Sequence, residues 1–361
     1  MAVVREKNEC QTRHKGSVCD MELEIPGSPD SNEPLHVSLV ATSDAQVSPL
    51  SGLFEALNAF PLLAQFEPDI PRKPFHVDIV GESADEATGA SGLPLLANRF
   101  CEDVAQTDIA IVPLMMVDGP DWVRGRYPSL VEWLRTMHGG GASLCSACTG
   151  VLLMAETGLL SGREATIHWA FAPTFERNFP DIRLRTEEVL ITAGERDEFV
   201  MTGGVMSWHD LALHLISRHV GPTAATSMAR LLMLQWHSEG QTPYMSFAPV
   251  MDHDDALVAR LQQWLEIHYM VANPVEELSC LAGLPPRSLE RRFARAAGMS
   301  PIAYVQARRI EEAKRRLERT SMPIDKIGFD VGYENTAFFR RLFKRQTNLT
   351  PSAYRRRFHL I

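Results

Sequence analysis

A cysteine among small residues is the part of this chain best suited to chemistry. Ser146-Ala147-Cys148-Thr149-Gly150 would place a thiol at a sharp strand-to-helix turn, because small neighbours let the backbone bend. The start of the following helix favours a thiolate. His168, in the stretch Thr166-Ile167-His168-Trp169, follows twenty residues later and could serve as a base. The pair predicts either nucleophilic chemistry or a ligand pocket.

Two interpretations of the neighbouring Cys145 stay open. Cys145 and Cys148 form a C-x-x-C pair, so Cys145 could resolve a disulfide switch, or it could be a small buried hydrophobe. The chain has no second C-x-x-C, which argues against structural zinc. His209 and His214 are five residues apart and lie on different faces of a helix. We predict no metal site and no cofactor.

Aromatic residues near predicted strand ends indicate what a pocket would bind. Trp169, Phe171 and Trp208 are placed to wall it, and aromatic walls suit an amine or a quaternary ammonium group through cation–π contact. Such residues also serve as core. The candidate ligand-binding residues are Cys148, His168, Trp169 and Trp208.

The elements that must position these residues alternate between apolar runs and helical patterns. The predicted strands are Leu35–Ala41, Phe75–Val80, Ile109–Pro113, Ser143–Ala147, Ala165–His168, Val189–Thr192 and Phe199–Thr202. The predicted helices are Leu50–Ala59, Ser129–His138, Gly150–Thr157 and Ser207–Val220. This alternation predicts an α/β fold, a flavodoxin-like sandwich with a mostly parallel sheet and the ligand at the carboxyl ends of the strands.

The last third of the chain contains an internal repeat. Phe293, Gly298, Ser300, Pro301 and Tyr304 recur fifty residues later as Phe343, Asn348, Thr350, Pro351 and Tyr354. Each copy follows a glycine, Gly283 or Gly332, that separates two amphipathic runs. Helix, glycine turn and helix predict a helix-turn-helix unit, here present twice, at about 274–297 and 323–347.

Charge separates this region from the rest of the chain. Residues 254–361 contain 19 Lys and Arg against 12 acids, a net charge of +7, whereas the other residues have a net charge of −16. A basic domain on an acidic protein indicates a polyanionic partner.

Together, the repeat and its basic runs resemble the DNA-binding domain of AraC/XylS transcription regulators, an all-α pair of helix-turn-helix units joined by a long helix. The segment Ala303–Arg319 fits the joining helix. The resemblance implies DNA contacts by Arg287, Ser288, Glu290, Arg291 and Arg295 in the first unit and by Asn335, Thr336, Arg340, Arg341 and Lys344 in the second. Arginine forks suit guanine and asparagine suits adenine. Arg295, Lys344 and Arg355–Arg357 are expected to meet phosphates.

Two residues depart from the first copy of the motif. Asn348 replaces a glycine, and we expect no loss because asparagine tolerates a left-handed turn. Gly328 costs about 1 kcal/mol of helix propensity and is expected to loosen the second unit.

The cysteine and histidine stretches resemble the PfpI-like branch of the class I glutamine amidotransferase superfamily over about Leu35–Val220. With the double helix-turn-helix, the chain resembles the GlxA type of AraC-family regulator. In the PfpI-like branch an acidic residue after the first strand assists the thiol. No acid stands near Ser48 and Pro49; Asp44 lies early and Glu55 lies inside the next helix. We therefore predict a regulator and not an enzyme.

This organisation predicts a disordered tail at 1–33, a sensor domain at 34–236, a linker at 237–253 and a DNA-binding domain at 254–361. Cys10, His14 and Cys19 in the tail lack a fourth metal ligand at a standard spacing. An apolar helix at Thr223–Trp236 could pack on its own domain or on a second copy in a homodimer. No membrane span or signal peptide is evident, and six cysteines without a disulfide framework indicate the cytoplasm.

The resulting hypothesis is a ligand-responsive regulator that binds promoter DNA. We expect it to activate a catabolic operon with RNA polymerase in response to an amino-acid-like or methylated-amine effector. Two alternatives are a cysteine-dependent hydrolase or amidotransferase with a DNA-binding appendage, and a ligand-independent DNA-binding protein whose first domain only dimerises.

Overall fold

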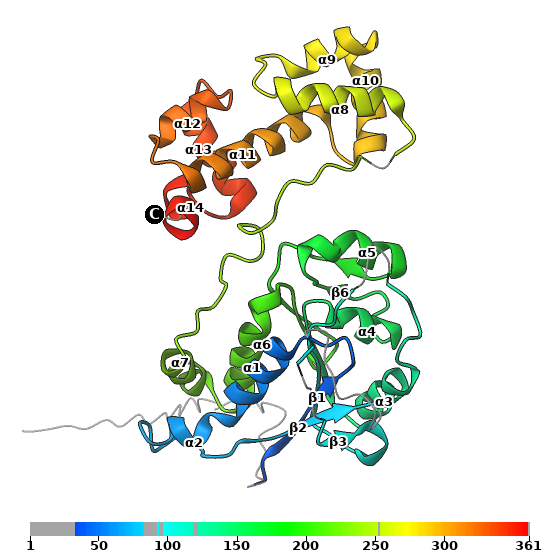
Figure 1. Ribbon diagram of the computed structural model, residues 1–361, viewed down its shortest axis with the longest axis vertical. Coiled ribbons are helices and arrows are strands. Elements are labelled where there is room, and N and C mark those ends of the chain that lie inside the picture. Colours follow the sequence, from blue (N-terminus) through cyan, green and yellow to red (C-terminus); the bar gives the residue numbers. More distant parts are fainter. Residues whose placement is uncertain (1–32, 83–91, 94–96, 118–121, 252, 360–361) are drawn as a thin grey trace, which may run out of the picture. The chain divides into compact units, whose positions relative to one another are not determined.

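The computed structural model describes residues 33–82, 92–93, 97–117, 122–251 and 253–359 (Figure 1). The residues that precede 33, including Cys10, His14 and Cys19, lie outside this range. Within it, no helix is both long enough and apolar enough to cross a membrane.

A seven-stranded sheet forms the first half of the chain, and the predicted α/β class is confirmed. The strand order is β3-β2-β1-β4-β5-β9-β8, with every pairing parallel except the antiparallel pair of β8 and β9. The strands are β1 Leu35–Ala41, β2 Phe75–Gly81, β3 Arg99–Phe100, β4 Ile109–Val112, β5 Ser143–Ala147, β8 Leu190–Ala193 and β9 Phe199–Thr202. Strands β4 and β9 are buried along their whole length, which explains their uninterrupted apolar sequences.

One predicted strand is wrong. Ala165–His168 does not enter the sheet; only β6, Glu164–Ala165, is extended, and it pairs with β7, Arg183–Leu184, in a separate two-stranded sheet. The Thr166 hydroxyl donates instead to the carbonyl of Glu188, and the Ile167 carbonyl accepts from the side chain of Gln241. Side-chain partners thus replace the strand ladder at these residues.

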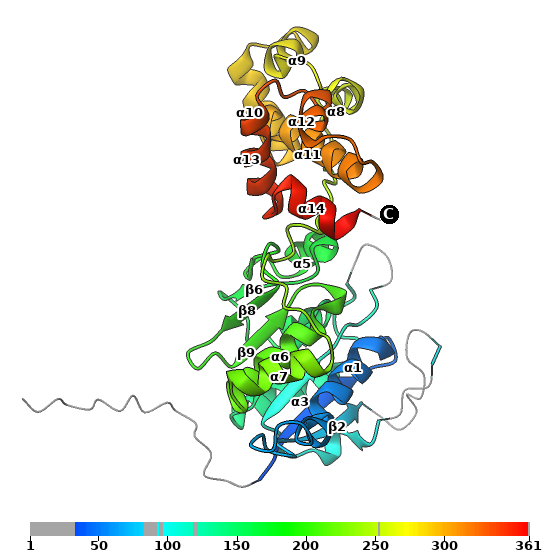
Figure 2. The same ribbon diagram turned by 90° about the vertical axis from the view of Figure 1, so that its left-hand side faces the viewer.

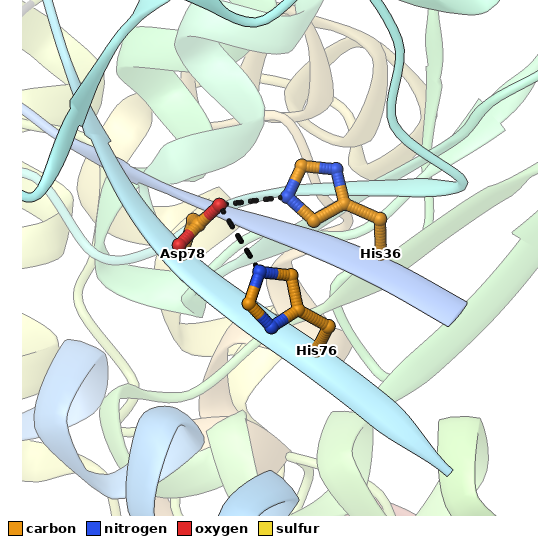
Figure 3. Close-up of side chains that lie close together, drawn as sticks. All are labelled: His36, His76 and Asp78. Carbon is orange, nitrogen blue, oxygen red and sulfur yellow. Dashed lines mark hydrogen bonds and ion pairs between the residues drawn. The ribbon is translucent and has the colours of Figure 1, made fainter. Parts of the chain in front are cut away.

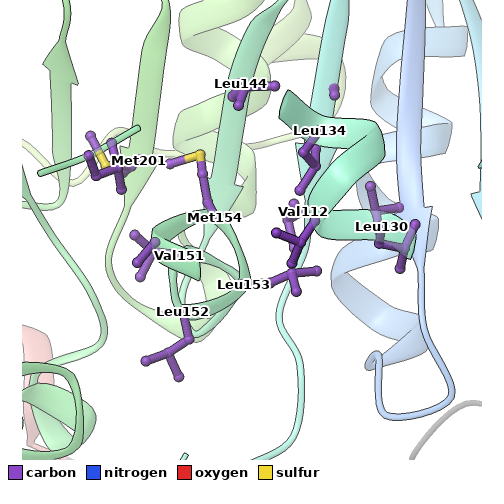
Figure 4. Close-up of a cluster of buried hydrophobic side chains, with 14 of the residues drawn as sticks. Val112, Leu130, Leu134, Leu144, Val151, Leu152, Leu153, Met154 and Met201 are labelled. Carbon is purple, nitrogen blue, oxygen red and sulfur yellow. The ribbon is translucent and has the colours of Figure 1, made fainter. Parts of the chain in front are cut away.

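Helices cover both faces of the sheet (Figure 1). Helices α1 and α6 pack together on one face with α7, and α3 and α4 fill the other face, where their leucines and methionines meet β4 and β5 (Figure 4). The helices of this half are α1 Val47–Asn58, α2 Phe60–Leu63, α3 Pro128–Gly139, α4 Gly150–Glu156, α5 Ala172–Asn178, α6 Trp208–His219 and α7 Pro222–Leu231, with short 3-10 turns at Cys101–Asp103, Trp169–Phe171 and Val205–Ser207. Ala224, Ala225 and Met228 of α7 are buried in this domain's own core.

The second half is entirely helical, as predicted. Its helices are α8 Ala256–His268, α9 Pro274–Ala282, α10 Pro286–Ala297, α11 Pro301–Arg319, α12 Ile324–Asp330, α13 Thr336–Thr347 and α14 Pro351–Phe358. The pairs α9/α10 and α12/α13 pack into two separate cores, joined by the long helix α11. Figure 2 shows α10 and α13 on the same side of α11.

The sequence repeat reflects repeated helix ends. Ser300 and Thr350 cap α11 and α14 by accepting a hydrogen bond from the backbone three residues later. Gly298 and Asn348 both adopt the left-handed conformation just before these caps, with φ of 72° and 55°. The prediction that Asn348 can replace glycine here is confirmed.

Gly328 has a different role from the predicted one. A Cβ at this residue would lie 2.8 Å from Cδ1 of Phe339, which is fully buried. The glycine therefore lets α12 approach α13 closely, a packing role that the sequence analysis did not anticipate.

Candidate functional site

The predicted sharp turn at Cys148 is present. Cys148 follows β5 with φ of 56°, a left-handed conformation that is uncommon for a side-chain-bearing residue, and α4 begins two residues later. Gly150 permits the turn, since a Cβ there would lie 2.2 Å from the carbonyl oxygen of Val112. The Thr149 hydroxyl accepts from the backbone N–H of Met115 at 3.1 Å and donates to its carbonyl at 2.5 Å.

The Cys148 thiol is buried at this turn. Its solvent-exposed fraction is 0%, and burial raises its pKa to about 12, despite hydrogen bonds from Thr149 and from the backbone N–H of His168. Among the described residues, the groups that act on the pKa of this thiol are Thr149 and His168, and neither is an acid. Asp44, the acid closest to the predicted position, is bound by Arg126, Thr42 and Tyr127. The expectation of a favoured thiolate is wrong, because loss of hydration outweighs the helix start.

Cys145 is likewise fully buried and packs in the core between the sheet and α6. Burial raises the pKa of its thiol to about 12. Both thiols of the C-x-x-C pair are therefore protonated at neutral pH, which matches the interpretation of Cys145 as a small hydrophobe better than that of a redox pair.

His168 and Trp169 do line a cavity. The cavity, of about 220 Å³, is lined by His168, Trp169, Val189, Gly204, Val205, Met206, Ser207, His237, Gln241 and Tyr244. His168 accepts a hydrogen bond at Nδ1 from the backbone N–H of Ala170, and burial lowers the pKa of the ring. The neutral ring therefore carries its proton on Nε2, leaving that N–H to serve a ligand.

Two of the four predicted ligand residues do not line this cavity. Cys148 is fully buried, and Trp208 packs against α1, where a Cβ on Gly52 would lie 2.6 Å from the indole ring. The second large aromatic ring of the cavity lining comes instead from Tyr244.

Tyr244 belongs to the predicted linker, and so does Gln241, whose exposed fraction is only 3%. The Gln241 side-chain amide donates to Thr166 Oγ1 and to the carbonyls of Ile167 and Glu188, at 2.9–3.2 Å. Its oxygen accepts from the backbone N–H of Trp169 at 3.3 Å. These bonds hold the first half of the linker against the pocket.

Two glycines make room for that attachment. A Cβ on Gly203 would lie 2.0 Å from Nε2 of Gln241, and one on Gly240, whose φ is 71°, would lie 2.2 Å from the carbonyl oxygen of Glu187. The sequence prediction treated Gly240 only as a linker residue, although it provides close backbone contact.

His237 fixes the start of the linker. Its backbone N–H and its Nδ1 both bond the Asp210 carboxylate of α6, at 2.9 and 2.7 Å. Its ring stacks on that of His209, with 5.1 Å between the ring centroids. His237 therefore anchors the start of the linker to α6, at the point where the linker begins to line the cavity.

In the helical half, most residues predicted to contact DNA are exposed on the second helix of each unit. Arg287, Glu290, Arg291 and Arg295 are exposed on α10, where Ser288 is half-buried; Arg340, Arg341 and Lys344 are exposed on α13, where Thr336 is half-buried.

Three polar side chains of these units have structural partners. The Asn335 side-chain oxygen caps α13 by accepting from the Phe338 backbone, so it is committed to the helix end. Arg340 pairs with Asp325 at 2.7 Å, and Arg292 pairs with Asp255, lowering the pKa of that carboxyl to about 2. Of the predicted arginines of α13, Arg341 is the one for which the structure gives no such pair.

Arg309 of α11 is a residue that the sequence prediction missed. Its exposed fraction is 7%, and its guanidinium donates to the carbonyls of Tyr269, Val271 and Gly332, at 2.7–2.8 Å. The first two carbonyls follow α8 and the third lies in the turn of the second unit. In the sequence, Arg309 stands beside the apolar stripe of a long helix. An arginine at such a position is as often solvated as buried, so the sequence did not indicate this role.

Comparison with known proteins places both halves. The DJ-1/PfpI family matches residues 20–206, and a helix-turn-helix domain matches residues 278–357. The HTH-type transcriptional regulator CdhR of Pseudomonas aeruginosa is 28% identical over 295 residues, covering 77% of this chain and 82% of that protein. The HTH-type transcriptional regulator GlxA of Rhizobium meliloti is 26% identical over 228 residues, covering 62% of this chain and 68% of that protein.

Proposed function

The chain belongs to the DJ-1/PfpI family and is an AraC-type DNA-binding transcription regulator, and we propose that a small effector bound in the cavity beside His168 controls it. One observation carries this proposal. The cavity is walled partly by the α/β domain and partly by the segment that leads to the DNA-binding helices. A ligand there would contact both.

The lining favours an amino-acid-like or methylated-amine effector. Trp169 and Tyr244 offer aromatic faces for an ammonium group. Gly204–Ser207 precede α6, so the positive end of that helix is available to a carboxylate, as is the Nε2–H of His168. A volume of about 220 Å³ suits a molecule of that size.

The linker provides a route from ligand to DNA. Gln241 and Tyr244 wall the cavity, and three residues later Phe247 packs on Tyr304 of α11 with 5.1 Å between ring centroids. The Phe247 backbone N–H also donates to Glu311 of α11 at 3.2 Å. An effector that favours one linker conformation would bias the placement of the DNA-binding helices by its differential affinity.

On DNA, we propose that α10 and α13 enter successive major grooves, about 34–36 Å apart, with α11 as the spacer. Exposed arginines on both helices support this arrangement, with Arg291 and Arg341 as base readers and Arg295 and Lys344 on phosphates. We further propose that the protein works in the cytoplasm as a homodimer, which would read paired sites, and that it activates a catabolic operon together with RNA polymerase.

The experiment is a thermal-shift screen of the full chain against amino acids and methylated amines, followed by reporter induction. A ligand at 100 times its Kd should stabilise the protein by about 2.7 kcal/mol. Val205→Trp, which fills the cavity from an exposed residue, and Trp169→Ala should abolish the shift and the induction while operator binding without ligand persists. Val123→Trp, at an exposed residue outside the cavity lining, is the matched control. Full induction in folded Val205→Trp would place the effector elsewhere.

A further inference from the structure

Two histidines and a buried aspartate meet at the amino ends of β1 and β2, the edge of the sheet opposite the effector cavity. His36 and His76 are register partners in the parallel pair, and Asp78 lies two residues further on the same face of β2 (Figure 3). His36 Nε2 lies 2.9 Å from Asp78 Oδ2, and His76 Nε2 lies 3.7 Å from the same oxygen. The three side-chain atoms lie within 4.8 Å of one another.

The two contacts of the His36 ring leave a place for a cation between its Nε2 and Asp78. Its Nδ1 lies 3.2 Å from the carbonyl oxygen of Gln106, and a carbonyl can only accept, so Nδ1 must carry a proton. A neutral imidazole has no second N–H. Its Nε2 therefore directs a lone pair at the Asp78 carboxylate from 2.9 Å, unless a proton or a metal ion lies between them.

Further hydrogen bonds hold the side chains of this cluster in place, as hydrogen bonds to the ligands do in known metal sites. The carbonyl of Gln106 fixes the ring of His36, and Asn98 donates to Asp78 Oδ1 at 2.8 Å while itself accepting from the backbone of Ile79 at 2.7 Å. Burial raises the pKa of Asp78, but the contacts with His36, Asn98 and His76 outweigh it and hold the pKa below its usual value.

We infer that His36 Nε2, His76 Nε2 and Asp78 Oδ2 bind a divalent first-row transition metal ion, with Zn²⁺ as the representative. Zn²⁺ bonds of about 2.0–2.2 Å in a tetrahedral site require ligand atoms about 3.4 Å apart. The two Nε2 atoms lie 2.9 and 3.7 Å from Asp78 Oδ2, and all three ligand atoms lie within 4.8 Å of one another, so the half-exposed His76 would move to close the site around the ion. Three protein ligands leave a fourth position for water, on the solvent side where His76 lies.

Among the residues that the structure describes, Arg99 is the arginine or lysine that lies within 4.0 Å of this oxygen. Its Nη1 lies 3.9 Å from Asp78 Oδ2, and 44% of its side chain is exposed. An arginine at that distance and exposure can move into solvent, so it would be displaced by a metal ion bound directly to the carboxylate.

A second His-His-Asp cluster, His209, Asp210 and His237, serves as an internal comparison. There the backbone N–H of His237 donates to Asp210, and its Nδ1 lies 2.7 Å from the same carboxylate and can donate to it, so the contacts are complete without a metal ion. Sequence spacing alone does not indicate the first cluster, because only the parallel register brings His36 beside His76.

The test is a titration of the full-length, chelator-stripped protein with Co²⁺, followed by Zn²⁺ competition. We expect one equivalent of Co²⁺ to bind without a thiolate-to-cobalt charge-transfer band. His76→Gln, which changes a half-exposed side chain, should weaken binding at least about tenfold, the loss typical of disturbing a metal site. Metal should also raise the unfolding temperature of the wild-type protein and not that of His76→Gln.

The matched control is His237→Gln, which should bind Co²⁺ as the wild-type protein does. The inference is overturned if the wild-type protein binds no Co²⁺, because a proton would then satisfy His36. It is also overturned if His76→Gln keeps full affinity, or if binding is lost in His237→Gln alone. A thiolate-to-cobalt charge-transfer band would show that cysteines bind the ion, and it would also overturn the inference.

Discussion

Arg309 Nη1 donates to the carbonyl of Gly332 at 2.8 Å, and this bond joins the long helix α11 to the turn of the second helix-turn-helix unit. Gly332 has φ of 96°, and a Cβ on it would lie 2.9 Å from the guanidinium carbon. The same guanidinium holds two carbonyls that follow α8. The Arg309 side chain therefore ties the segment after α8 and the turn of the second helix-turn-helix unit to the same helix, α11.

We expect Arg309→Met to destabilise the helical domain by about 3 kcal/mol or more, because three carbonyls lose hydrogen bonds from a charged donor. Urea unfolding measures the change. Arg319→Ala, at an exposed residue of the same helix, should change stability by less than about 0.5 kcal/mol. Equal losses of unfolding free energy in the two variants would contradict the bridging role of Arg309.

Gly328→Ala should also destabilise the protein, although alanine is the better helix former by about 1 kcal/mol. The new methyl group would lie 2.8 Å from the buried Phe339 ring, and such overpacking costs about 1–3 kcal/mol. Gly139→Ala is the control, since a Cβ at the end of α3 meets nothing within 4 Å. A more stable Gly328→Ala protein would show that the two helices do not pack so closely.

Cys148 should resist alkylation in the folded protein. Burial raises the pKa of its thiol to about 12, so the thiolate fraction at pH 8 is very small. Peptide mapping after iodoacetamide treatment should show modification of Cys148 at least about a hundredfold slower than that of the exposed Cys280. We also expect no amidase or peptidase turnover above a Cys148→Ala control. Rapid labelling of Cys148, or turnover that depends on it, would restore the enzyme hypothesis.

Stability should fall on mild acidification, in part through His219. Burial lowers the pKa of this ring from 6.5 to about 4, with Arg218 and His214 adding to the effect. Between these values the unfolded chain binds a proton that the folded chain does not, so the free energy of unfolding falls by up to about 1.4 kcal/mol for each pH unit of acidification. Above pH 6.5 the ring is neutral in both states, and its contribution to stability is fully present. Denaturant unfolding of His219→Gln from pH 7 to 4 should show a shallower loss; an unchanged slope would contradict this role.

Arg341→Ala should cost about 1–3 kcal/mol at the cognate operator and much less on unrelated DNA, if the exposed guanidinium reads a base. Arg291→Ala should behave in the same way. Lys344→Ala should weaken both kinds of binding alike, because a phosphate contact carries no sequence information. Gel-shift titrations on both DNAs distinguish these outcomes, and unchanged cognate affinity in both arginine variants would mean that the recognition helices are assigned wrongly.

The sheet and the elbow were predictable because their signals are local. Buried parallel strands such as β4 and β9 are continuous apolar runs, and β1 and β5 begin and end where the pattern predicts. The turn at Cys148 follows from its small neighbours. Burial of that thiol was not predictable, because it depends on what Thr149 and the later segment at His168 place around the sulfur.

The pocket walls were predictable only in part. Polar, glycine-containing sequence between two domains is typical of a free linker, and nothing local distinguishes Gln241 from an exposed glutamine. Its burial depends on carbonyls of Ile167 and Glu188, more than fifty residues earlier, that lack strand partners. Trp208 was misplaced because an aromatic residue at a strand end can face the pocket or, as here, the neighbouring helix.

The attachment of Gln241 also bears on how regulators of this type could exchange their parts. A chimera joined just before His237 would carry the whole sheet but would lose Gln241 and Tyr244, and with them one wall of the cavity. A junction placed after Tyr244 would keep that wall intact. The unit that recombination can transfer with the cavity intact therefore extends thirteen residues beyond Leu231, the end of the last helix of the α/β domain, to Tyr244. The boundary of inheritance differs from the boundary of secondary structure.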